Sequence, residues 1–95
     1  IVDSVLNVTA ETAAGEAVTR LHGATQLYIV DTGSPPQAMS DLAPVRYLEL
    51  SAVNKVTIGS FEAAYDYDSG AGEVTISITN AGDAVVRTTK TVSWP

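Results

Sequence analysis

Residues 65–94 read YDYDSGAGEVTISITNAGDAVVRTTKTVSW, and this stretch decides the expected fold. Between turn signals at 68–72 and 80–83, the apolar residues Val74, Ile76 and Ile78 alternate with Thr and Ser. Successive side chains of a strand point to opposite faces, so one face is apolar and the other carries hydroxyl groups. The pattern predicts a three-stranded antiparallel meander with one face on a core and one face in water.

The composition limits the size of the protein and the class of its partners. The chain has 95 residues, and we expect a single domain over residues 1–95. It contains no Cys, which excludes disulfide bonds and Cys-ligated metals. The net charge of −6, with only five scattered Lys and Arg residues, argues against nucleic acid and anionic membrane surfaces as partners. No run approaches the roughly 18 apolar residues of a membrane span.

The chain begins with Ile1 rather than Met. We therefore expect Ile1 to follow a processing site or to begin an excised fragment.

Runs rich in β-branched residues indicate further strands before residue 65. They are expected at 2–10, 16–22, 25–31, 45–50 and 53–60, in addition to the strands at 73–79 and 84–94. Residues 61–66 either continue the strand at 53–60 around a bend at Gly59 or form a separate strand. For residues 38–42 the sequence favours neither of two alternatives, a short helical turn or a loop without regular structure. About seven or eight short strands at even spacing are typical of a small all-β domain, so the predicted fold is an Ig-like antiparallel β-sandwich.

The core of this sandwich is expected to contain the apolar residues at alternating strand positions: Leu6, Val8, Val18, Leu27, Ile29, Leu48, Leu50, Val56, Ile58, Val74, Ile76, Ile78, Val86 and Val92.

The last third of the chain resembles the Ig-like modules of bacterial, archaeal and phage surface proteins. These modules commonly end in a Gly-Glu-Val-Thr strand, an Asn/Asp-Ala-Gly-Asp/Asn turn and a Thr-rich strand, which match Gly72–Thr79, Asn80–Asp83 and Thr88–Ser93. The resemblance implies a β-sandwich at a cell or virion surface. The Cys pair and the strand-C Trp of antibody-type domains are absent, and Trp94 stands at the end of the chain.

A catalytic interpretation attaches to Asp31-Thr32-Gly33, which follows an apolar run. This motif resembles the active-site loop of aspartic proteases, where paired carboxylates share one proton, and makes a retropepsin-like protease a remote alternative. The second apolar-apolar-Gly element of that family is missing downstream, and Pro35-Pro36 follows directly. An ordinary turn is the favoured interpretation. His22 is the only His, so the chain has neither a His pair nor a Cys-His pair.

A metal-binding interpretation attaches to Asp66, Asp68 and Glu73, which lie around two glycines. Calcium takes six to eight oxygen ligands, and alternating carboxylates in a loop are able to supply some of them. A complete EF-type loop is absent, and the competing interpretation is a solvated acidic hairpin tip. These residues support the alternative function, a calcium- or carbohydrate-dependent adhesion module. Asn7-Val8-Thr9 also matches the N-glycosylation acceptor pattern.

The favoured function is a non-enzymatic structural protein without a cofactor. We expect a virion surface component (decoration, tail or fibre protein) or a subunit of a cell-surface filament, located outside the cell or on the virion. Its partners are expected to be copies of itself or neighbouring subunits, contacted through sheet edges or loops. One hypothesis is that Ile1–Val8 is donated as a strand to an adjacent subunit.

Overall fold

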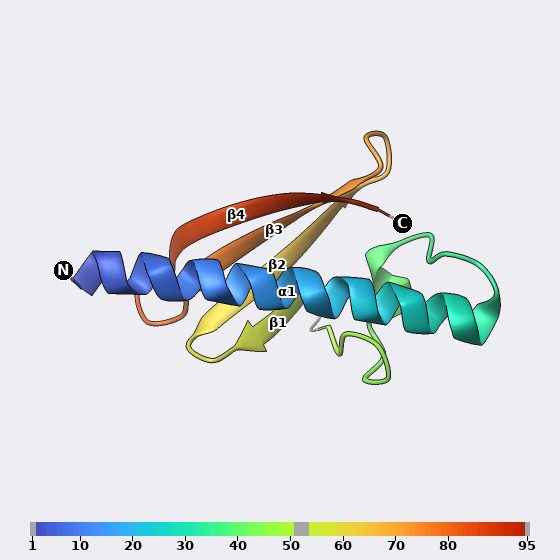
Figure 1. Ribbon diagram of the computed structural model, residues 1–95, viewed down its shortest axis with the longest axis horizontal. Helices are drawn as coiled ribbons and strands as arrows, with labels where there is room; N and C mark the ends of the chain where they lie inside the picture. The colour runs from blue at the N-terminus through green and yellow to red at the C-terminus, as the bar shows by residue number, and fades with distance from the viewer. Residues whose placement is uncertain (1, 51–53, 95) are drawn as a thin grey trace.

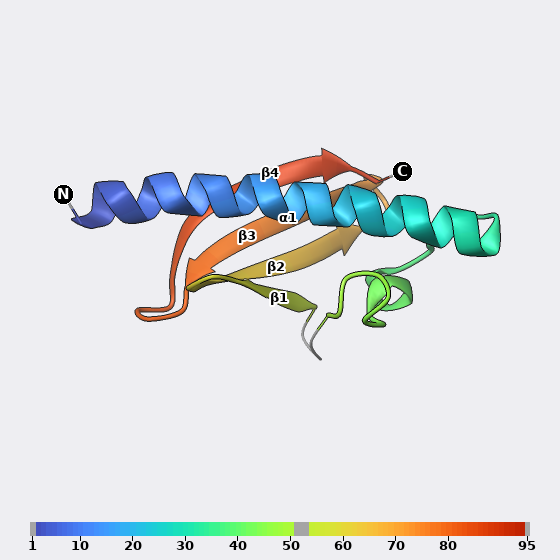
Figure 2. The same cartoon turned by 60° about the horizontal axis from the view of Figure 1, so that its bottom comes forward.

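The computed structural model describes residues 2–50 and 54–94, with side chains from residue 5 onwards, and consists of one long helix lying across a four-stranded sheet (Figure 1). The elements are α1 (Val2–Thr32), η1 (Met39–Leu42), β1 (Lys55–Ile58), β2 (Phe61–Asp68), β3 (Glu73–Asn80) and β4 (Val85–Ser93). The fold is therefore α+β, and the prediction of an all-β, Ig-like sandwich is wrong. Helix α1 covers the sheet face that a second sheet would occupy (Figure 2).

The strands predicted at 2–10, 16–22 and 25–31 all lie within α1, which has 31 residues. The reason is a buried stripe at helical spacing that consists mostly of alanine: Ala10, Ala13, Ala14, Ala17, Leu21 and Ala24. Small side chains let the helix lie close to the sheet, and this packing outweighs the strand preference of the many Val and Thr residues. The strand predicted at 45–50 is also absent, because residues 45–48 form turns and residues 49 and 50 belong to no strand.

Helix α1 ends where the catalytic interpretation placed a loop. Gly33 adopts a positive φ of 79°, and its N–H donates to the carbonyl of Ile29 at 2.7 Å. This is the usual left-handed cap of a helix C-terminus, which glycine adopts without strain. The prolines at 35 and 36 then prevent the helix from continuing.

The sheet is an antiparallel meander in the order β1-β2-β3-β4, and this confirms the meander predicted for 65–94. A two-residue turn at Gly59 and Ser60 joins β1 to β2, with Gly59 at φ 60°. β1 begins at Lys55, and Val53, the first residue of its predicted strand, lies outside the described residues. A bulge interrupts the β3–β4 register beside Ile78 and leaves Arg87 as the extra residue of β4.

The core lies between α1, the inner face of the sheet and the segment with η1. Six predicted core residues are confirmed as buried: Leu48, Val56, Ile58, Val74, Ile76 and Ile78. Leu6, Val18, Leu50 and Val92 pack against this core but are only partly buried. The prediction is wrong for Val8 and Val86, which are 69% and 55% exposed.

Polar contacts fix the helix and the chain end on the sheet. The Tyr65 hydroxyl donates to the Ala17 carbonyl at 2.9 Å across the core, where burial raises the pKa of Tyr65 to about 12. Trp94 stacks on Tyr67 with a ring separation of 4.2 Å, and its indole N–H donates to the carbonyl of Pro36 at 2.9 Å. The helix, the loop after it and the last strand therefore form one packed body.

Candidate interaction surface

Among the side chains that the structure describes (residue 5 onwards), the face of α1 that points away from the sheet carries no charge. Its exposed residues follow one line at spacings of three and four: Val5, Val8, Thr12, Gly15, Thr19, Gly23, Gln26 and Val30. We call this line the outward stripe. Val5 is 60% exposed and Val8 69%, and the two lie one turn apart, so their apolar surfaces adjoin on this face.

Two threonines make the outward stripe less polar than its sequence suggests. The hydroxyls of Thr12 and Thr19 donate to the carbonyls of Val8 and Gly15, four residues earlier, at 3.3 and 3.0 Å. The hydroxyls are thereby turned towards their own helix, and the methyl groups are left to face outwards. Apart from the amide of Gln26, the stripe therefore presents methyl groups and glycines along the length of α1.

Further exposed valines lie at the end of the molecule where α1 begins. β4 starts beside the N-terminal half of α1 (Figure 1), where Thr88 donates to Glu11 at 2.6 Å. Val85 and Val86, the first residues of β4, are 45% and 55% exposed. These valines lie on β4 and not on the outward stripe, and Val86 is opposite Thr79 in the register, so it shares the face of Thr79.

The outer face of the sheet has the opposite character. Apart from Val86 opposite Thr79 at one end, it presents hydroxyl groups at alternating positions of the two last strands: Thr75, Ser77, Thr79, Thr89 and Thr91. The hydroxyls of Thr75 and Thr91 lie 3.3 Å apart across the ladder. This face suits contact with water, whereas the outward stripe of α1 does not.

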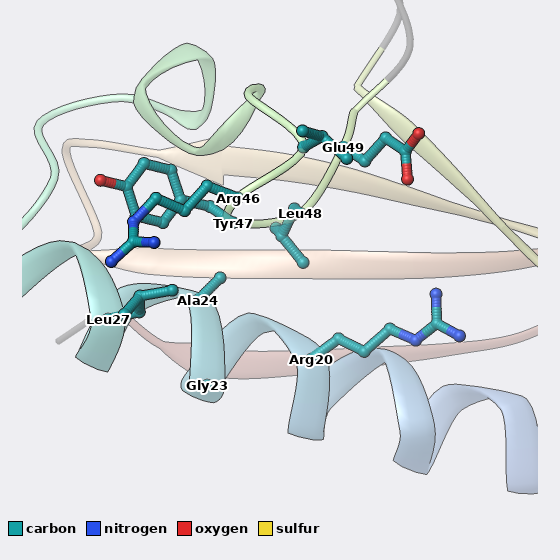
Figure 3. A pocket seen from close by; sticks show the side chains of 9 residues that line it. Arg20, Gly23, Ala24, Leu27, Arg46, Tyr47, Leu48 and Glu49 are labelled. Atoms are coloured by element: carbon teal, nitrogen blue, oxygen red, sulfur yellow. The ribbon is translucent and has the colours of Figure 1, made fainter.

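A groove of about 360 Å³ lies between α1 and the 45–49 segment (Figure 3). Ala24, Leu27 and Leu48 form its apolar walls. Arg20 and Arg46 extend towards opposite ends of it, so their guanidinium groups do not converge on one ligand. The groove therefore lacks the convergent polar groups that fix a small molecule.

Asp31, the residue of the catalytic interpretation, lies in the last turn of α1. Its carboxylate accepts two hydrogen bonds from Arg46, at 2.6 and 3.0 Å, and one from the Tyr47 hydroxyl at 2.8 Å. The hydrogen bonds from Arg46 and then Tyr47 lower the pKa of Asp31 to about 2. Both oxygens are occupied in joining the helix end to the following segment, and a carboxylate held ionised in this way is unsuited to sharing a proton.

The residues of the calcium interpretation lie at the β2–β3 hairpin. Asp68 and Glu73 are a cross-strand pair, and Asp66 lies two residues earlier on β2. One Asp68 oxygen accepts the N–H groups of Gly70 and Ala71 at 3.0 and 3.2 Å, which closes the turn. Among the described residues, no three acidic or His side chains are grouped so as to hold a metal ion.

The remaining singled-out residues lie on α1. His22 is exposed, and so is Asn7 of the acceptor pattern, while the hydroxyl of Thr9 donates to the Val5 carbonyl at 2.9 Å. The prediction of strands in residues 2–31 overlooked the outward stripe. The sequence does indicate it, because uncharged residues recur there at a mean spacing near 3.6, the period of a helix.

No protein-family model, curated protein or solved structure matches this chain. In the part of the chain that the structure describes, neither α1 nor the shorter η1 has the length and apolar character of a membrane span.

Proposed function

We propose that this protein is a non-enzymatic structural subunit of a repetitive assembly at a virion or cell surface, which acts through contacts with copies of itself or neighbouring subunits. The observation that carries the proposal is the outward stripe. A soluble helix normally places charges on its free face. Among the described residues, three of the six exposed large apolar side chains lie on the outward stripe instead: Val5, Val8 and Val30.

The charge pattern favours a second copy as the partner. Two chains that each carry a net charge of −6 repel one another wherever their acidic residues meet. The outward stripe is uncharged, and its nearest ion pair, Glu16 with Arg20 at 3.2 Å, lies beside the line and is neutral as a pair. Copies therefore meet along this face with little electrostatic cost.

The size of the stripe favours several contacts per copy over a simple dimer. Residues 5–30 span about 37 Å of helix, and a helix is roughly 10 Å wide, so the stripe offers on the order of 400 Å² per copy. A pair then buries about 800 Å², less than the ~1,200 Å² of a small stable interface. Each subunit needs a further contact, which is the situation in a repetitive assembly.

The proposed mechanism replaces the strand-donation hypothesis. Residues 2–8 belong to α1 and are not free to add to a neighbouring sheet, while Ile1 lies outside the described residues. Packing of helix faces takes the place of strand donation, and its small residues allow close approach of backbones.

The test compares two glutamates one residue apart on the same helix. Val8→Glu places a charge on the outward stripe, whereas Asn7→Glu places the same charge on an exposed position about 100° around the helix. We expect Val8→Glu to weaken self-association at least about tenfold and Asn7→Glu to leave it within about twofold, since a charge buried in an apolar contact is costly. Light scattering over a concentration series gives the mass, and circular dichroism checks the fold.

A wild-type chain that remains at 9.9 kDa up to millimolar concentration, alone and with its neighbouring subunits, contradicts the proposal. Equal losses in both variants contradict the assignment of the outward stripe.

A further inference from the structure

We propose that β4 is a second self-association site, at which its free edge pairs antiparallel with β4 of another copy to continue the sheet. This inference rests on the proposed function, because the partner is again a copy of the chain. It identifies the additional contact that the limited area of the outward stripe requires.

The two edges of the sheet differ in length. β1 forms one edge with four residues, whereas β4 forms the other with nine and is the longest strand. Natural sheets usually shorten or cover their edges, because an edge exposes unpaired N–H and C=O groups to any other strand. Figure 1 shows β4 on the rim of the sheet, where it pairs with β3 on one side and no other described strand lies beyond it. β4 is therefore the edge available for pairing.

The composition of β4 suits pairing with itself. Thr88, Thr89, Thr91 and Ser93 supply hydroxyl groups, and Thr or Ser residues opposite one another in a sheet form favourable cross-strand pairs. Such a pair already occurs inside this sheet, where the Thr75 and Thr91 hydroxyls are 3.3 Å apart. The added strand would repeat this arrangement one position further out.

Charge limits the register of the proposed pair. A two-fold axis at Lys90 would place two ammonium groups directly opposite each other, which is unfavourable. An axis at Thr89 or Thr91 instead places Lys90 opposite an uncharged residue, Thr88 or Val92 of the other copy. Lys90 also keeps its own partner, Glu11, at 3.7 Å. The pair is therefore expected to centre on Thr89 or Thr91.

Together, the two sites give each copy a helix contact and a strand contact in different directions. A chain with two separate self-contacts is able to link copies continuously rather than stop at a dimer. The hydroxylated outer face of the sheet then becomes one continuous surface across neighbouring subunits.

The absence of Cys from the chain makes a cross-linking test direct. Directly opposite residues of antiparallel strands have Cα atoms about 4.5–5.5 Å apart, within the range that a disulfide bridges. Thr89→Cys and Thr91→Cys are oxidised mildly in otherwise wild-type chains under assembling conditions. Ser77→Cys is the matched control, because Ser77 is the β3 neighbour of Thr89 on the same outer face but lies one strand inside the edge.

We expect one of the two β4 variants to form disulfide-linked dimers at least about tenfold faster than Ser77→Cys. Cross-linking of neither variant above the control, in a chain that still assembles, overturns the edge pairing and leaves the proposed function standing. A chain that is monomeric and does not cross-link at any of the three positions overturns both. Circular dichroism of the variants ensures that a negative result comes from folded protein.

Discussion

The two long faces of α1 both lack charged side chains over the described residues but have different surroundings. The inward face, with Ala10, Ala14 and Leu21, is fully buried on the sheet. The outward face, with Val8 and Thr12, has the same lack of charge but is exposed. Burial explains the first composition, because apolar area removed from water stabilises the fold. The fold does not require an uncharged outward face, because that face is in contact with water. This difference between the two faces is the main reason for proposing that the outward face takes part in assembly.

The strongest test of this comparison removes apolar atoms from each face. Leu21 is 0% exposed, so Leu21→Ala leaves a cavity between α1 and the sheet and should lower the free energy of unfolding by about 3 kcal/mol. Val8→Ala removes atoms that are already in water and should change the free energy of unfolding by less than about 0.5 kcal/mol. Urea denaturation of both variants at a concentration where the chain is monomeric measures the difference.

Equal losses in the two variants would mean that the outward face is buried within the monomer. In that case the helix would pack on both sides and the stripe would have a structural role instead.

A second, smaller effect is expected when side chains are added to adjacent positions. Ala14 is fully buried, so Ala14→Leu overfills the contact with the sheet and should cost about 1–3 kcal/mol. A Cβ on Gly15 would meet no atom within 4 Å, so Gly15→Ala should stabilise the monomer by about 0.5–1 kcal/mol through higher helix propensity. Thermal unfolding monitored by circular dichroism should therefore shift in opposite directions for the two variants. Shifts in the same direction contradict the assignment of the faces.

The sequence predicted the second half of the chain well and the first half poorly. Val74, Ile76 and Ile78 alternate strictly with Thr and Ser, and this period of two occurs only in a strand with one buried face. In residues 2–32 the helical spacing of the buried positions is formed mostly by Ala, which is only weakly hydrophobic. Val and Thr residues, which favour strands, lie between these positions and obscure the helical period. The helix exists because of its contact with the sheet, and a single sequence does not display that contact directly.

The candidate surface was predictable only in part. The acidic composition led to protein contacts as a hypothesis, which stays a prediction. Val8 and Val86 were expected in the core, because the period of a strand places every second Val on the buried face, and both are exposed. Asp31 was singled out by a three-residue motif, and only the fold reveals that Arg46 and Tyr47, fifteen and sixteen residues later, bind its carboxylate. Motifs of this length do not specify their surroundings.

The smallest expected effect is a change in self-association that distinguishes the methyl group of Thr12 from its hydroxyl group. Its hydroxyl donates to the Val8 carbonyl at 3.3 Å, so the outward contact should depend on the methyl group alone. Thr12→Val keeps a methyl on the stripe and should leave self-association within about twofold. Thr12→Ser keeps the hydroxyl and removes the methyl, which is worth about 0.8 kcal/mol, or roughly a fourfold weaker association. Sedimentation equilibrium resolves a change of this size. If Thr12→Val associates more weakly than Thr12→Ser, the hydroxyl and not the methyl contacts the second copy. The outward stripe would then be a polar contact surface rather than an apolar one.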